Sequence, residues 1–96
     1  MILKERDTDE GLLVAVCDED VLGETFEDGD VSLTVSEEFY GGEPADEQTV
    51  VDTLARASVA NIVGTEAVEL AIREGFVEEA NVLDIENTRH AQFLRM

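Results

Sequence analysis

Residues 36–44, Ser-Glu-Glu-Phe-Tyr-Gly-Gly-Glu-Pro, separate two parts of the chain that differ in hydrophobic period. Before this stretch, Val31, Leu33 and Val35 alternate with polar residues, a pattern typical of a strand with one buried face. After it, apolar residues recur at helical spacing. The stretch therefore marks the change from strands to helices. Its two adjacent aromatic rings and two adjacent glycines also make it the first candidate for a functional site.

Two strands are predicted before residue 18. Residues 2–6 form a short strand, and the six consecutive apolar residues 12–17 form a second one. Six apolar side chains cannot all face one side, so the second strand is expected at the centre of the sheet, covered on both faces. Residues 18–23 then predict a helical turn, with Asp18 as its cap and Gly23 at its end.

The second half of the chain predicts a helical hairpin followed by a β-hairpin. One helix begins at Pro44 or Asp46 and ends at Gly64, with Leu54 and Ile62 among its inner residues. Thr65 caps a second helix, which ends near Gly75 with Phe76 folded back upon it. Residues 82–86 and 89–95 predict two strands joined at 87–88.

These elements define an α+β fold with one domain over residues 1–96. A small, mostly antiparallel sheet from the N- and C-terminal strands is expected, covered by the central helical hairpin. A chain of 96 residues is long enough for one such core and too short for two.

The charge of the chain is extreme: 24 acidic residues oppose 6 basic ones, and the formal net charge is −18. The carboxylates are dispersed among periodic apolar residues, which argues against a disordered acidic tail or a nucleic-acid mimic with one acidic face. Adaptation to molar salt explains the charge better, because the Debye length falls to about 3 Å at 1 M. The early charges at Lys4 and Arg6 exclude a signal peptide, and no apolar run is long enough to span a membrane, so a cytoplasmic location is expected.

Catalytic and metal-binding patterns are lacking in the sequence. The acidic loops at Asp18 and Asp28 fail the calcium-loop pattern, because Gly29 and Phe39 occupy the twelfth positions. His90 is the only histidine, and Cys17 is expected to be a buried, unreactive thiol. We therefore predict no catalytic residue, no metal ligand and no cofactor.

Two groups of residues are candidates for binding. Phe39 and Tyr40 could form a stacking platform or an anchor for a partner, or they could belong to the core. The glycines that follow could expose N–H groups to an anion, or simply form a turn. A donor-rich segment in the last hairpin is either a recognition patch or a solvated turn. The candidate binding residues are Phe39, Tyr40, Gly41, Gly42, Arg89, His90 and Gln92.

Several segments resemble an archaeal family called domain of unknown function 424. They are residues 29–30, 35–42, 60–64, 67–72 and 90–92. The resemblance covers nearly the whole chain and implies an archaeal, cytoplasmic, single-domain protein without an established activity. Together with the acidic composition, it suggests a haloarchaeal member.

The leading hypothesis is a non-enzymatic binding module associated with RNA or a ribonucleoprotein in translation. A protein–protein adaptor without nucleic-acid contact is the alternative, and an enzyme that uses His90 with an unidentified second residue comes third. Convergence of Phe39 and Tyr40 with Arg89 and His90 on one exposed surface would support a recognition site, whereas two buried rings with the His90 segment on the opposite side would contradict it.

Overall fold

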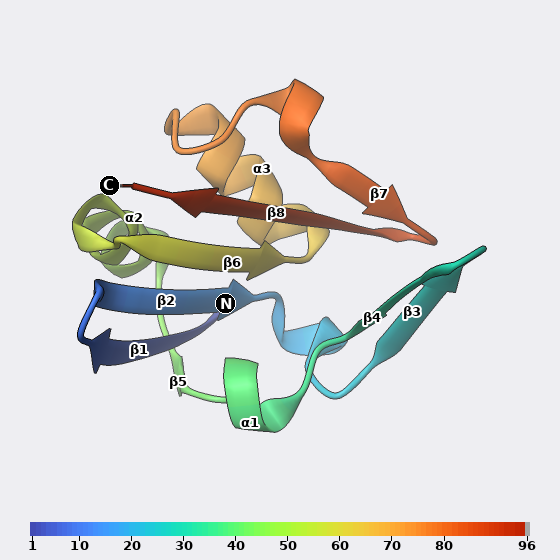
Figure 1. Ribbon diagram of the computed structural model, residues 1–96, viewed down its shortest axis with the longest axis horizontal. Helices are drawn as coiled ribbons and strands as arrows, with labels where there is room; N and C mark the ends of the chain where they lie inside the picture. Colours follow the sequence, from blue (N-terminus) through green and yellow to red (C-terminus); the bar gives the residue numbers. More distant parts are fainter. Residues whose placement is uncertain (96) are drawn as a thin grey trace.

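A mixed six-stranded sheet forms the centre of the protein in the computed structural model, which describes residues 1–95 (Figure 1). The strand order is β5-β1-β2-β6-β8-β7, and every neighbouring pair is antiparallel except β2 and β6. The strands of this sheet are β1 (Ile2–Thr8), β2 (Gly11–Cys17), β5 (Glu43–Pro44), β6 (Val59–Val63), β7 (Leu83–Ile85) and β8 (Thr88–Leu94). A separate hairpin consists of β3 (Thr25–Asp28) and β4 (Val31–Thr34).

The two faces of the sheet are covered differently. Helices α2 (Glu47–Arg56) and α3 (Thr65–Arg73) lie behind the sheet in Figure 1 and enclose the larger apolar cluster, which includes Val14 and Ile62. The short helix α1 (Glu37–Tyr40) and the β3–β4 hairpin pack on the other face. Two 3-10 turns, η1 (Glu19–Val21) and η2 (Glu79–Asn81), complete the elements. No helix within residues 1–95 is long and apolar enough to cross a membrane.

Several predictions are confirmed. Strand β2 is central, between β1 and β6, and Val14, Val16 and Cys17 are fully buried. The last two strands form the expected hairpin. Asp46 caps α2, because its carboxylate accepts a hydrogen bond from the Thr49 N–H at 2.9 Å. The fold is α+β in class and its sheet is mostly antiparallel, as predicted, but the parallel pair of β2 and β6 is not part of the prediction.

The predicted long helix over residues 46–64 is wrong. Helix α2 ends at Arg56, and Val59–Val63 forms strand β6, so α2 and α3 are not a hairpin. The spacing of Leu54, Ser58 and Ile62 fits one face of a helix, but the side chains of residues 59–63 also alternate between the two faces of a strand, with Ala60 and Ile62 on the helix side of the sheet. Two neighbouring strands, β2 and β8, satisfy the backbone of β6 on both sides, and this tertiary pairing decides the conformation.

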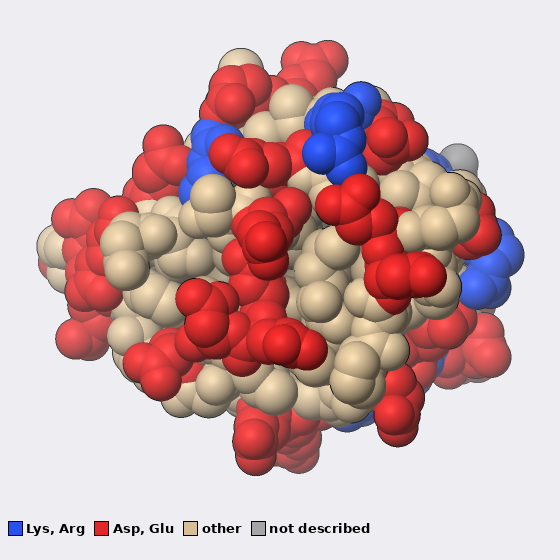
Figure 2. Space-filling model, turned by 180° about the vertical axis from the view of Figure 1, so that it is seen from behind, with Lys and Arg blue, Asp and Glu red and all other residues tan. Residues whose placement is uncertain are grey.

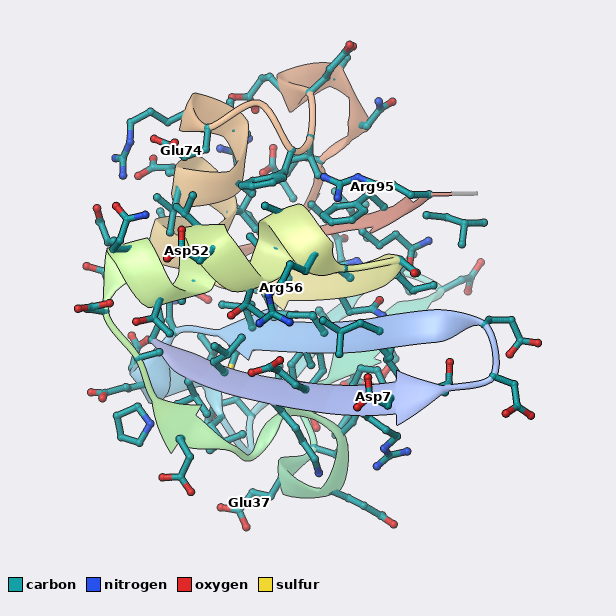
Figure 3. All side chains as sticks on the ribbon, turned by 90° about the vertical axis from the view of Figure 1, so that its left-hand side faces the viewer. Asp7, Glu37, Asp52, Arg56, Glu74 and Arg95 are labelled. Atoms are coloured by element: carbon teal, nitrogen blue, oxygen red, sulfur yellow. The ribbon has the colours of Figure 1, made fainter. Side chains whose placement is uncertain are left out.

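The end of α2 has no local stop signal, because its cap comes from the other end of the chain. The Arg95 guanidinium donates hydrogen bonds to the carbonyls of Leu54, Ala55 and Ala57 at 3.0–3.3 Å. A helix leaves its last carbonyls without the usual backbone partners, and Arg95 supplies donors to them, although the Leu54 carbonyl also accepts a hydrogen bond from the Ala57 N–H. Figure 3 shows Arg95 beside aromatic rings, and it lies over those of Phe76 and Phe93. The local sequence therefore does not predict that α2 ends at Arg56.

The predicted caps at Thr65 and Asp18 are also wrong. Gly64 occupies the position before α3, with φ 116°, and Thr65 is already helical. Asp18 occupies the predicted N-cap position of turn η1, but its side chain forms no cap hydrogen bond there. Its carboxylate instead accepts hydrogen bonds from the N–H groups of Glu66 at 3.0 Å and Ala67 at 2.8 Å. A residue at the end of β2 therefore caps the helix that follows β6.

The predicted burial of one face of the strand around Val31 is confirmed only in part. Val35 is fully buried and Leu33 partly so, but Val31 is 44% exposed. Strand β4 pairs only with β3, and its hairpin extends beyond the six-stranded sheet. The position near an edge was thus predicted correctly, and the burial at the hairpin tip was not.

Candidate binding face

The sheet face opposite α2 and α3 carries no carboxylate at any strand position. Side chains alternate along a strand, and the two apolar clusters show which residues face each side. The strand residues on this face are Ile2, Lys4, Arg6, Thr8, Gly11, Leu13, Ala15, Cys17, Pro44, Val59, Asn61, Val63, Leu83, Ile85, Thr88, His90, Gln92 and Leu94. A quarter of the chain is Asp or Glu, 24 of 96 residues, so the absence of both from this face is unexpected.

The helix side of the same strands does carry charge. Glu5 and Asp7 of β1 and Asp84 of β7 belong to it, and Glu5 pairs with Arg56 of α2 at 3.3 Å. Figure 3 shows Arg56 on α2, above the first two strands. Figure 2 views the side on which the helices lie, and Asp and Glu are scattered over most of it. Carboxylates are therefore dispersed on one side of the sheet and excluded from the strands of the other.

Part of the carboxylate-free face is covered, and part is open. Helix α1 and the β3–β4 hairpin bury the end that contains Cys17, Val63 and Ile85. The remainder, which we call the open face, is half-buried or exposed. It includes the strand residues Lys4, Arg6, Leu13, Val59, Asn61, Leu83, His90, Gln92 and Leu94, together with Phe39 of α1.

The cations of the open face are free of carboxylate partners. Arg56, Arg73 and Arg89 all form ion pairs with carboxylates. Across residues 1–95, Lys4 and Arg6 form none, although acidic residues outnumber basic ones fourfold. The Lys4 ammonium donates only to the backbone carbonyl of Glu38. These two side chains therefore retain charge for an external anion.

Three polar side chains on the open face also lack partners. In the described part of the chain, the side chains of Asn61, His90 and Gln92 form no hydrogen bond with protein atoms. Asn61 and Gln92 are direct cross-strand neighbours. Burial lowers the pKa of His90, so its imidazole is neutral at neutral pH and offers one donor and one acceptor. Across the sheet it is paired with Val63 and Leu83, neither of which can transfer a proton.

The two predicted aromatic residues have different environments. Phe39 is half-buried and borders a small pocket that Lys4, Arg6, Leu13 and Ala15 also line, so it belongs to the open face. Tyr40 is 4% exposed, and its ring meets that of Phe39 edge-on at a centroid distance of 5.0 Å. Burial raises the pKa of Tyr40 to about 12. Tyr40 is a core residue that supports Phe39, and it is not available for stacking on a ligand.

The adjacent glycines serve packing. The Gly41 N–H donates to the Glu37 carbonyl at 2.8 Å, and a Cβ at Gly41 would lie 2.4 Å from that oxygen. A Cβ at Gly42 would lie 2.1 Å from the Leu3 carbonyl oxygen. The segment leads into β5 and not into a helix, so the prediction of an anion site just before a helix does not match this geometry.

Arg89 does not converge with the other candidates. It lies on the helix side of β8 and pairs with Asp84 at 2.9 Å and with Glu79. The predicted site is therefore divided. Phe39, His90 and Gln92 share the open face, whereas Tyr40 is buried and Arg89 is on the opposite side.

Sequence reasoning missed Lys4, Arg6 and Asn61. Asn61 falls within the predicted long helix, and its position in a strand depends on the tertiary pairing of β6. A signal was present at Lys4 and Arg6, because alternation in residues 2–8 places both cations on one face and both acids, Glu5 and Asp7, on the other.

An acidic hollow lies elsewhere, at the carboxyl ends of β2 and β6. Its volume is about 710 Å³, and its lining includes Asp18, Glu24, Glu66 and Glu86. Both oxygens of Asp18 already accept hydrogen bonds. Within residues 1–95, no three His, Cys, Asp or Glu side chains are placed to hold a metal ion.

The fold and the open face together define a small α+β protein with one exposed, carboxylate-free sheet surface. A family model described as "Protein of unknown function (DUF424)" matches residues 5–96, and the chain belongs to this family. A comparison with curated proteins gives no match. The fold is similar to that in the crystal structure of an uncharacterized conserved protein from Methanopyrus kandleri, with a TM-score of 0.79 and 22% sequence identity. The alignment covers 99% of this chain and 92% of that one.

Proposed function

We propose that this protein is a non-enzymatic binding module that contacts RNA, alone or in a ribonucleoprotein, through the open face. The observation that carries the proposal is the exclusion of carboxylates from the strand positions of this face, combined with two cations that have no carboxylate partner among residues 1–95. Phosphates are repelled by the other surfaces of a protein with a charge of −18. The open face repels phosphate least, and it also offers hydrogen-bond donors, hydrogen-bond acceptors and the half-buried ring of Phe39.

The proposal includes a haloarchaeal origin and a cytoplasm with molar salt. Dispersed carboxylates and a single lysine support it. In such salt, phosphate contacts contribute little affinity, because condensed counterions gain little entropy when they are released into a concentrated salt solution. Binding then depends on stacking and hydrogen bonds, which Phe39, Asn61 and Gln92 can supply.

The experiment is a binding titration of labelled RNA in molar KCl with wild type and Gln92→Glu. Gln92 is exposed, so the substitution adds a charge to the open face at little cost in stability. We expect affinity to fall about tenfold, the value of one lost base contact with added repulsion. Asn81→Asp, on the exposed turn η2, adds the same charge outside the face and is expected to leave affinity unchanged. Equal losses in both variants would refute the assignment of the open face.

A protein adaptor is the second candidate, and two exposed side chains favour it. Leu83 is 44% exposed and Leu94 is 67% exposed, both on the carboxylate-free face. Apolar residues beside polar ones are typical of protein interfaces. Co-purification from a haloarchaeal lysate in molar KCl, with half the sample treated with ribonuclease, separates the two functions. Partners lost after ribonuclease support RNA contact, whereas partners that survive support the adaptor.

A further inference from the structure

The open face is organised in rows that cross the sheet. The register pairs Lys4 with Ala15, Ala15 with Asn61, and Asn61 with Gln92, which makes one row with a cation at one end and two amides at the other. We call it the polar row.

A second row runs beside the first. The register pairs Arg6 with Leu13, Leu13 with Val59, and Val59 with Leu94. We call it the apolar row. Each row therefore begins with a cation on β1, and only the polar row offers hydrogen bonds beyond it.

The spacing of the rows suits a nucleotide chain. Lys4 and Arg6 are two residues apart on β1, so their Cα atoms are about 7 Å apart along the strand, and neighbouring strands are about 5 Å apart. Asn61 lies two strands from Lys4, at a lateral distance of about 10 Å. Ala15, between Lys4 and Asn61, is only 3% exposed and Phe39 packs against its cluster, so the sugar that joins a phosphate at Lys4 to a base at Asn61 would cross over Phe39. Phe39 borders both rows at their β1 end.

Carboxylates border this surface on the β1 side. The β1–β2 turn contributes Asp9 and Glu10, and α1 contributes Glu37 and Glu38; all are exposed. A duplex would carry its many phosphates over this rim, whereas two nucleotides of a single strand would remain inside it. The surroundings therefore favour a short, unpaired segment.

We infer that the open face binds a dinucleotide step of single-stranded RNA, with one phosphate at Lys4 and one at Arg6. One base extends along the polar row to Asn61 and Gln92, and its neighbour lies on the apolar row over Leu13 and Val59. This inference rests on the proposed function. Hydrogen bonds distinguish bases, whereas apolar contacts and stacking accept any base. Sequence preference is therefore confined to one of two adjacent positions.

The test measures binding of single-stranded RNA oligonucleotides in which every dinucleotide step is placed in a constant uridine context, at several KCl concentrations. Wild type is expected to show a preference of about tenfold at one position and little at its neighbour. Asn61→Ala and Gln92→Ala should each remove much of this preference. Arg6→Gln should weaken all sequences alike and reduce the salt slope by about 0.7, the contribution of one phosphate contact in a single strand.

Controls keep the outcomes distinct. Gln92 is exposed, so Gln92→Ala tests the polar row even if Asn61→Ala disturbs the half-buried strand. A duplex that binds as tightly as the single strand, or a preference that survives both amide substitutions, would overturn the dinucleotide assignment and leave the RNA function in place. If no RNA binds in any arm, the proposed function itself fails.

Discussion

Two hydrogen bonds join the Asp18 side chain, at the end of β2, to the start of helix α3, which is distant in sequence. Their removal has a predictable cost in the free energy of unfolding. The carboxylate is 6% exposed and accepts two hydrogen bonds from backbone N–H groups at the start of α3. Hydrogen bonds to a charged group contribute about 1.5–3 kcal/mol each, and loss of an N-cap costs about 0.5–2 kcal/mol. Because both bonds share one cap, we expect Asp18→Ala to reduce the free energy of unfolding by about 2–4 kcal/mol.

Urea unfolding followed by far-ultraviolet circular dichroism, at one fixed molar KCl concentration, measures this loss. Asp18→Asn keeps one acceptor oxygen and loses the charge that interacts with the helix dipole, so it should cost about half as much. Asp20→Ala, in the exposed part of the same turn, is the matched control and should change stability by less than about 0.5 kcal/mol. If Asp18→Ala costs no more than Asp20→Ala, the cap across the fold does not stabilise the protein as argued.

Three further predictions concern residues that hold the sheet and helices together. Gly64→Ala should cost about 1–3 kcal/mol in the same unfolding assay, because φ is 116° and a Cβ would lie 2.3 Å from the Asp18 carboxyl carbon. A wild-type value would contradict that crowding. Arg95→Gln should cost about 1 kcal/mol, since its guanidinium lies 4.7 Å from the centre of the Phe93 ring and caps α2; unchanged stability would show that neither contact matters. Burial raises the pKa of Cys17 from 9.0 to about 11, so the folded state holds its proton more tightly than the unfolded state. Stability should therefore fall as pH rises from about 9 to 11, and Cys17→Ala should lack this part of the decline.

Local patterns determined the elements whose stabilising partners are near in sequence. The apolar run at residues 12–17 predicts a central strand, because six apolar residues need cover on both faces. Asp46 caps the helix that begins one residue later, and Gly75 has the positive φ of 81° that suits a residue just after a helix. In each case the residue and its partner are separated by a few positions, so the sequence contains the whole interaction.

The identity of β6 required the tertiary structure. The same five residues, 59–63, fit a helix by spacing and a strand by composition, and only pairing with β2 and β8 selects the strand. The C-terminus of α2 is likewise capped by Arg95 and the N-terminus of α3 by Asp18, and each of these residues is about 40 or more positions away in the sequence. No window of the sequence includes both partners.

The candidate site divides in the same way. Sequence alone identified Phe39, His90 and Gln92 as unusual residues in an acidic chain, but it could not separate them from Tyr40, which is buried. Strand order decided the rest, because it brings β1, β6 and β8 onto one face and places Asn61 between the cations of β1 and Gln92. Composition determined the charge of this protein, and only the arrangement of the strands decided where that charge is absent.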